Sequence, residues 1–167
     1  MLNNKIVIAD TSPLISMIKI KRLDLLEELF GSIVIPEAVF NELTDNNIYK
    51  DEADCIIKAD FIKRKPVADK RAVNILKNVA MLDDGESEAI VLFDELNADL
   101  LIIDERKGRT AAENLKIPLT GTIGILLAAF DKELASKQQI LQYIDIFQRE
   151  KRRLSPRLIN ILKLKFN

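Results

Sequence analysis

The stretch that decides the fold is residues 5–13, which read Lys-Ile-Val-Ile-Ala-Asp-Thr-Ser-Pro. A short run of Ile and Val predicts a strand that is buried on both faces of a parallel sheet. Ser12 followed by Pro13 predicts the N-cap and the first residue of a helix. Asp10 is therefore expected at the carboxyl end of the strand, which is the edge where open α/β sheets bind ligands.

A second aspartate repeats this pattern. Asp104 follows the apolar run 100–103 and precedes a helix expected over about 107–115. If the two strands are neighbours, Asp10 and Asp104 lie close enough to share a cation, whereas either one taken alone could simply cap the helix that follows it. Ser12 already supplies a cap for the first helix, which leaves Asp10 for another role.

Two glutamates are candidates to join these aspartates. At about 100° per residue, Glu86 points with the buried face of the helix that follows the expected turn 83–85, whereas Glu88 points away from that face. The alternative for Glu86 is a capping box with Asp83. Glu42 lies at the margin of the apolar face of its own helix, and by itself it reads as a surface residue. Carboxylates gathered at one strand edge repel each other and raise each other's pKa, so a cluster of this kind indicates a bound cation.

The rest of the chain alternates short apolar strands with helices, which predicts an α/β fold with a parallel sheet and right-handed crossovers. At 167 residues the chain is expected to form one domain over 1–167, with a core at about 5–130 and a C-terminal helical extension at about 131–167. Strands are expected at 5–10, 33–35, 61–67 (at a sheet edge), 100–103 and 117–119, and helices at 14–20, 23–30, 36–43, 51–59, 69–79, 86–97, 107–115, 122–130, 136–151 and 155–165.

Composition restricts the chemistry. The chain is 48% hydrophobic and 31% charged, as in globular proteins, and its apolar runs are too short to span a bilayer. A single cysteine, Cys55, and the lack of a signal-peptide pattern predict a cytoplasmic protein without membrane attachment. The sequence has no histidine, which excludes histidine bases and histidine metal ligands. A metal site must therefore use oxygen ligands, which favours Mg²⁺ or Mn²⁺.

Charge is distributed unevenly along the chain. Residues 137–167 contain eight Lys and Arg against two acids, a balance of +6, so the remainder carries −7. The basic residues gather at Arg149, Lys151, Arg152 and Arg153, between the two expected C-terminal helices. This cluster is expected either to contact a polyanion such as RNA or to act only as a solvated helix end.

Four segments together resemble PIN domains: Ile-Ala-Asp-Thr-Ser-Pro at 8–13, Ile-Pro-Glu-Ala-Val-Phe-Asn-Glu at 35–42, Asp-Gly-Glu-Ser-Glu-Ala-Ile at 84–90 and Leu-Ile-Ile-Asp-Glu-Arg at 101–106. The chain is most similar to a divergent PIN-like group of unknown function, related to VapC-type toxin ribonucleases. The resemblance covers about residues 5–130. The 18-residue step from Glu86 to Asp104 matches the separation of the last two acids in typical PIN sequences, which favours Glu86 over Glu88.

The resemblance implies a PIN-like three-layer α/β/α fold with a central parallel sheet and a Mg²⁺- or Mn²⁺-dependent endoribonuclease activity. Its catalytic acids would be Asp10, Glu42, Glu86 and Asp104, of which Asp10, Glu86 and Asp104 would hold the metal. The implied partners are RNA, an antitoxin protein and a second copy of the chain. The sequence departs from typical toxins at two places, because they carry Asp where Glu86 stands and Thr or Ser where this chain has Ile102-Ile103.

Residues near the last two strand ends are expected to contact RNA. Arg106, Lys107 and Arg109 follow Asp104 and would bind phosphates, with a solvated helix start as the alternative. Thr120 and Thr122 would offer hydroxyl and backbone N–H groups to a phosphate, or would only cap a helix. The alternative function is a catalytically weak or inactive PIN-like module that binds nucleic acid or a partner protein.

Overall fold

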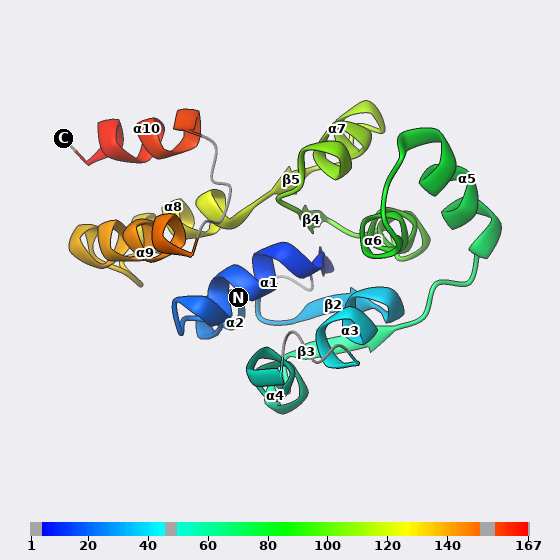
Figure 1. The fold of residues 1–167 in the computed structure, drawn as a ribbon, viewed down its shortest axis with the longest axis horizontal. Coiled ribbons are helices and arrows are strands. Elements are labelled where there is room, and N and C mark those ends of the chain that lie inside the picture. The colour runs from blue at the N-terminus through cyan, green and yellow to red at the C-terminus, as the bar shows by residue number, and fades with distance from the viewer. Residues whose placement is uncertain (1–4, 46–49, 151–155, 167) are drawn as a thin grey trace.

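The computed structural model describes residues 5–45, 50–150 and 156–166. Within these residues, five strands form one parallel sheet in the order β3-β2-β1-β4-β5 (Figure 1). The strand that precedes Asp10, β1, is therefore central. The strand that precedes Asp104, β4, is its direct neighbour. The predicted edge position of the third strand is also confirmed. The strands are β1 (Val7–Ala9), β2 (Ile33–Pro36), β3 (Ile62–Lys65), β4 (Leu100–Ile102) and β5 (Leu119–Thr120).

Two hydrophobic cores lie on opposite faces of the sheet, because alternate strand residues point to opposite sides. Val7 and Ala9 belong to one core, and Ile8 between them belongs to the other. The first core is shared with α1 (Thr11–Lys19), α2 (Asp24–Phe30), α3 (Glu37–Thr44), α4 (Lys50–Lys58), α8 (Thr122–Asp131), α9 (Lys137–Arg149) and α10 (Pro156–Lys165). The second is covered by α5 (Lys70–Ala80), α6 (Asp84–Glu95) and α7 (Arg106–Asn114). The expected three-layer α/β/α architecture is confirmed.

Three local predictions were wrong. The first helix begins at Thr11, with Asp10 rather than Ser12 at the N-cap position, because a proline is tolerated within the first turn, where backbone N–H groups have no helical partner. The expected turn at 83–85 is instead the start of α6, with Asp83 as its N-cap. The last strand, β5, lies later than the expected 117–119.

The C-terminal helices pack against the body of the same chain. Phe147 of α9 and Leu162 of α10 are fully buried in the first core. Arg22, between α1 and α2, donates hydrogen bonds to the Tyr143 hydroxyl at 3.1 Å and to the Leu134 carbonyl at 3.4 Å, which ties α9 to the first two helices.

The basic cluster between these helices is only partly described. Arg149 forms an ion pair with Asp145, one turn earlier on α9. Lys151, Arg152 and Arg153 lie outside the described residues. The RNA-contacting role of this cluster stays a prediction.

A candidate acidic active site

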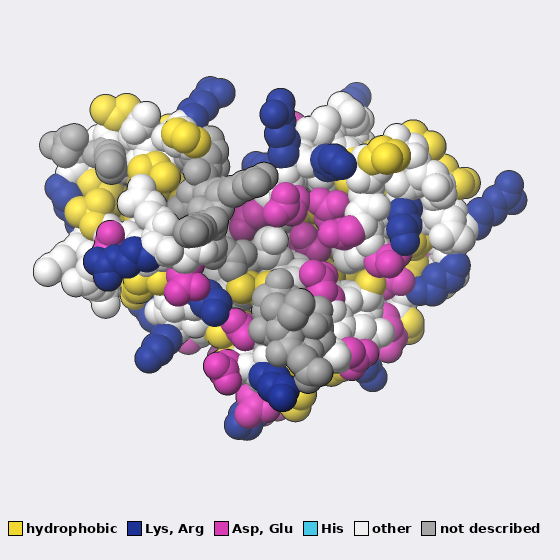
Figure 2. All heavy atoms as spheres, viewed as in Figure 1, with side chains coloured by type: hydrophobic (Ala, Val, Ile, Leu, Met, Phe, Trp, Pro, Cys, Tyr) yellow, Lys and Arg dark blue, Asp and Glu magenta, His cyan; other side chains and the backbone are white. Residues whose placement is uncertain are grey.

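Acidic side chains gather in a hollow at the middle of one face of the molecule (Figure 2). The hollow lies at the carboxyl edge of the sheet. The Asp10 backbone N–H donates to the Ile102 carbonyl at 2.9 Å, which extends the pairing of β1 with β4 up to the first of the candidate acids. The topology therefore places Asp10 and Asp104 just beyond the ends of adjacent strands, as predicted.

Asp10 is the buried centre of this cluster, with 3% of its surface exposed. Burial raises its pKa well above the usual value, and the negative charges of Asp83, Glu86 and Glu42 raise the pKa further. The Thr11 backbone N–H opposes these effects and lowers the pKa. The surroundings of Asp10 thus disfavour its ionised form unless a positive charge is present.

Glu86 forms the capping box considered from the sequence and also lies beside Asp10. Its carboxylate accepts from the Asp83 backbone N–H at 3.1 Å, while Asp83 accepts from the Glu86 backbone N–H at 2.8 Å, so the capping box exists. Glu86 is also buried and close enough to Asp10 to affect its pKa. Burial raises the pKa of Glu86 too, as do the nearby charges of Asp83 and Glu105.

Glu42 reaches the cluster from α3. Its Oε2 accepts a hydrogen bond from the Thr11 hydroxyl at 2.7 Å, and Thr11 is the residue directly after Asp10. The first turn of α1 therefore connects the two acids. This hydrogen bond orients Glu42 toward the hollow, although its side chain is exposed at the rim.

Asp104 has a different set of partners. Its two carboxylate oxygens accept from the Thr122 backbone N–H at 2.8 Å and from the Thr122 hydroxyl at 2.5 Å, so it caps α8. The capping alternative holds for Asp104, but for α8 rather than for the helix that directly follows it. In the parts of the chain that the structure describes, no three His, Cys, Asp or Glu side chains are arranged as metal ligands.

The chemistry of the donors nevertheless fits a hard divalent cation. All four candidates are carboxylates, which are the side chains that Mg²⁺ and Mn²⁺ prefer. Asp10 and Glu86 are buried next to further acids, which leaves an excess of negative charge in a place poorly reached by water. In the structure, Glu86 and Asp104 instead accept hydrogen bonds from Asp83 and Thr122.

Sequence reasoning missed three glycines that each contact one of the acids. A Cβ added at Gly85 would lie 3.2 Å from Asp10 Oδ1 and one at Gly108 would lie 2.8 Å from Glu86 Oε1. A Cβ at Gly121 would lie 2.4 Å from Asp104 Oδ1. The signal was present in the sequence, because a glycine at a helix start or inside a helix often marks a close approach of the backbone to another group.

Gly121→Ala is expected to push Asp104 away from Thr122 and so remove the cap of α8. The free energy of unfolding should fall by about 1–2 kcal/mol, the usual value of a helix cap. The measurement is denaturant unfolding of Gly121→Ala, Asp104→Ala and the double variant. Because both changes remove the same hydrogen bonds, the double variant should lose clearly less than the two losses added together. Additive losses would show that Gly121 does not act through Asp104.

The residues expected to contact RNA fall into two groups. Arg106 and Lys107 are exposed in the first turn of α7, just after Asp104. Arg109 is partly buried and donates to the Ile103 carbonyl at 2.8 Å. Thr122 is fully buried, and both groups that it could offer to a phosphate bind Asp104 instead. Thr120 is partly exposed at the end of β5.

The expectation that Glu88 points away from the buried face was wrong. Glu88 is 8% exposed, and its carboxylate accepts from the Ala38 backbone N–H at 2.9 Å and pairs with Lys70 at 2.8 Å. Helix α6 packs against the sheet on one side and against α3, α5 and α7 on others. Every residue of α6 from Gly85 to Leu92 is buried, so the helical wheel, which assumes a solvent face opposite the core face, could not place Glu88.

Asp10→Asn is expected to stabilise the metal-free protein at neutral pH. The raised pKa means that the folded protein binds this proton more tightly than the unfolded chain, so stability falls as pH rises from the unfolded value of 3.8 through the folded value. Asparagine removes this loss. The melting temperature of Asp10→Asn, measured in a chelator at pH 7, should exceed that of the wild type by roughly 2–4 °C for each kcal/mol of unfolding free energy that is gained. The difference should become smaller at acidic pH, where Asp10 of the wild type is protonated in both states. An unchanged or lower melting temperature at pH 7 would contradict the assignment of Asp10 as an electrostatically unfavourable group.

The fold is thus an α/β protein with a parallel sheet, and buried acids at the carboxyl edge of the sheet form a candidate cation site. A family model described as a PIN domain matches residues 6–166, so the chain belongs to the PIN-domain family. The match extends through α9 and α10, beyond the segments that carried the resemblance. The comparison with curated proteins found no match.

Family membership supports a broad class of activity, that of a hydrolase. The chain has the nuclease-type fold of PIN domains, which are generally nucleases, bind nucleic acid and usually use divalent metals. Among the described helices, none combines the length and apolar character needed to cross a membrane.

Proposed function

We propose that the chain is a Mg²⁺- or Mn²⁺-dependent endoribonuclease that hydrolyses phosphodiester bonds. The observation that carries this proposal is the buried carboxylate of Asp10 beside Glu42, Asp83 and Glu86 at the ligand-binding edge of a parallel sheet. Burying like charges together is unfavourable unless a cation compensates them. A divalent ion would compensate this charge and would also serve phosphoryl chemistry.

Each candidate residue has a role in this proposal. Asp10, Glu86 and Asp104 would hold the ion, which when bound neutralises phosphate charge and makes water a stronger nucleophile. Glu42, oriented by Thr11, would accept a proton from the attacking water. At the rim of the hollow, the basic side chains of Arg106, Lys107 and Arg109 and the hydroxyl of Thr120 would position the RNA backbone. The fully buried Thr122 would bind Asp104 rather than RNA.

The finer parts of the proposal rest on the resemblance to VapC-type toxins. They are a toxin role in the cytoplasm, an antitoxin partner and a homodimer. A toxin of this kind should arrest growth when its expression is induced in a host cell, and Asp10→Asn should not. Sedimentation of the purified chain tests the homodimer.

The direct test of the enzyme is metal dependence of the wild-type protein. An end-labelled RNA and a DNA of the same sequence are incubated with the protein in chelator and then with Mg²⁺, Mn²⁺ or Ca²⁺. We expect cleavage of RNA only with Mg²⁺ or Mn²⁺. The same ions should raise the melting temperature, since binding at 100 times Kd adds about 2.7 kcal/mol of stability. Cleavage that persists in chelator would overturn the proposal.

One observation favours the alternative of a catalytically weak or inactive binding module. Glu86 and Asp104 already accept hydrogen bonds from Asp83 and Thr122, and those bonds compete with a metal. A module of this kind would bind RNA or a partner protein without cleaving RNA. Retention of the labelled RNA without cleavage, together with no metal-induced change in melting temperature, would support it.

A further inference from the structure

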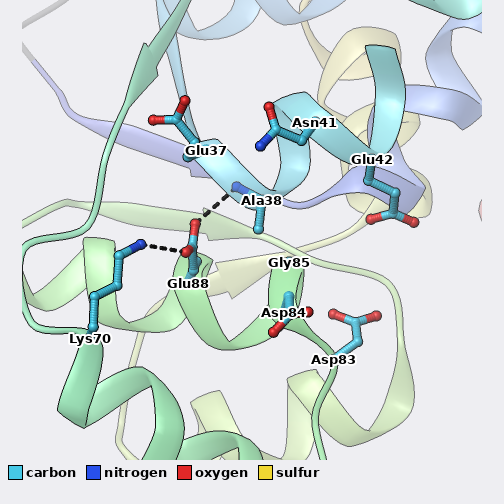
Figure 3. A pocket seen from close by; sticks show the side chains of 9 residues that line it. All are labelled: Glu37, Ala38, Asn41, Glu42, Lys70, Asp83, Asp84, Gly85 and Glu88. Atoms are coloured by element: carbon cyan, nitrogen blue, oxygen red, sulfur yellow. Dashed lines mark hydrogen bonds and ion pairs between the residues drawn. The ribbon is translucent and has the colours of Figure 1, made fainter. Parts of the chain in front are cut away.

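Glu88 connects three helices close to the acidic hollow. Its Oε2 accepts from the Ala38 backbone N–H in α3 at 2.9 Å, and its Oε1 pairs with the Lys70 ammonium group at the start of α5 at 2.8 Å. Glu88 itself belongs to α6. Figure 3 shows these two contacts at one side of a pocket of about 550 Å³, with Glu42 and Asp83 at the other side.

The contact with Ala38 replaces a missing helix cap. The N-cap position of α3 is Pro36, whose side chain has no hydrogen-bond acceptor, and α3 has no side-chain cap of its own. The carboxylate of Glu88 supplies the acceptor from another helix. Its negative charge also suits the positive end of the α3 dipole. The start of α3 is therefore held by α6 rather than by its own sequence.

The same helix pair carries the acids. Glu42 lies one turn after Ala38 on α3, and Gly85 lies one turn before Glu88 on α6. A Cβ at Gly85 would lie 3.4 Å from Glu42 Oε2 and 3.2 Å from Asp10 Oδ1, so the backbone of α6 passes close to both carboxylates. The interface between α3 and α6 thus has the acids at one end and the Glu88 bridge at the other.

We infer that Glu88 is a positioning residue for the acidic site: its bridge to Ala38 and Lys70 fixes α3 against α6 and so holds Glu42 beside Asp10. Lys70 keeps the buried carboxylate compensated, because a buried charge without a partner is strongly unfavourable. The catalytic consequence rests on the proposed function, whereas the structural consequence, the placement of Glu42, does not.

The chain contains a matched control on the same helix. Glu95, seven residues after Glu88 in α6, accepts hydrogen bonds from the backbone N–H groups of Ala68 at 3.0 Å and Asp69 at 2.7 Å. Glu95→Ala therefore also removes a carboxylate that binds backbone N–H groups, but those groups belong to the segment before α5 and not to α3. A purely structural role of Glu88 would make the two alanine variants differ only in stability.

The experiment measures kcat and KM for RNA cleavage at a temperature where every variant is folded. Glu88→Ala should lower kcat by roughly 10- to 100-fold, the usual effect of removing a group that orients site residues, and should change KM much less. Glu88→Gln retains an oxygen acceptor for Ala38 and should recover most of kcat. Glu95→Ala should keep kcat within about twofold of the wild type, as expected for a surface contact outside the site.

Two results would overturn the inference. One is equal kcat for Glu88→Ala and Glu95→Ala, and the other is a Glu88→Gln variant as impaired as Glu88→Ala. If Glu88→Ala does not fold, Glu88→Asp replaces it, because this shorter carboxylate keeps the charge but cannot reach both partners. Glu88→Asp should then lose kcat, and wild-type kcat in Glu88→Asp would overturn the inference.

A crystal structure of the Glu88 variant separates this inference from the proposed function. The hydrogen bond between Thr11 and Glu42, 2.7 Å in the wild type, should be lost or lengthened in Glu88→Ala, or in Glu88→Asp if that variant replaces it. An unchanged bond would overturn the inference even in an active enzyme. If the wild type cleaves no RNA, the proposed function fails, and a displaced Glu42 still supports the positioning role.

Discussion

Asp10→Asn is expected to reduce metal-dependent RNA cleavage by roughly 100-fold or more. Charge stabilisation by a bound metal contributes several kcal/mol to a transition state, and each 1.4 kcal/mol or so corresponds to a factor of ten in rate. Asparagine retains the shape of the side chain but loses the charge that would attract the ion. The measurement is single-turnover cleavage of a labelled RNA at saturating Mn²⁺, with Mn²⁺ affinity measured on the same samples by calorimetry.

The control for this variant is Asp94→Asn. Asp94 is an exposed aspartate on α6, away from the capped end that carries Glu86. The Asp94→Asn substitution should leave both RNA cleavage and Mn²⁺ affinity unchanged. Cleavage by Asp10→Asn at the wild-type rate, with unchanged Mn²⁺ affinity, would show that Asp10 is not a metal ligand and that the activity arises elsewhere.

The second large effect is on stability. Phe147→Ala is expected to lower the free energy of unfolding by about 3–5 kcal/mol, the usual cost of removing a buried aromatic side chain. Phe147 is fully buried and belongs to the same core as Val7 and Ala9 of the central strand. For a chain of this size the melting temperature should fall by about 2–4 °C for each kcal/mol. Denaturant unfolding followed by circular dichroism measures the loss directly.

Leu141→Ala is the matched control on the same helix, because Leu141 is 39% exposed. Its loss should be well under half that of Phe147→Ala. The comparison tests whether α9 is an integral part of one domain over 1–167. A Phe147→Ala variant that melts in two steps, with the main transition unchanged, would instead define α9 as a separate unit.

The sequence predicted the sheet well because its strands are short apolar runs with clear ends. Runs of Ile, Val and Leu located β1, β2 and β4. Asp10, directly after β1, and Asp104, just beyond the end of β4, indicated the ligand-binding edge. The strand expected at 61–67 was correctly predicted at a sheet edge, because its lysines and Pro66 disfavour a central position. Each of these signals is local, so it could be read without knowing how the chain folds.

The contacts between helices could not be predicted in the same way. Whether Glu88 is buried depends on where α3 and α5 lie, and neither position follows from the sequence of α6. Asp83 was recognised only as a possible cap, although its charge also raises the pKa values of Asp10 and Glu86. Thr122 was expected to bind a phosphate, or only to cap a helix, because it stands where a strand leads into a helix. Its hydrogen bonds to Asp104 could not be predicted, because Asp104 follows a different strand.

The pairing of β1 with β4 also has a consequence for protein synthesis. Ile6 and Asp99, which bracket this pairing at its start, are 93 residues apart in the chain. Contacts between such distant segments form late, because the intervening loop must first close. During translation, more than half of the chain is therefore synthesised after β1 before β4, its second neighbour, emerges from the ribosome. A nascent chain would then lack both the pairing of β1 with β4 and the Asp104 carboxylate until this later part of the chain has emerged.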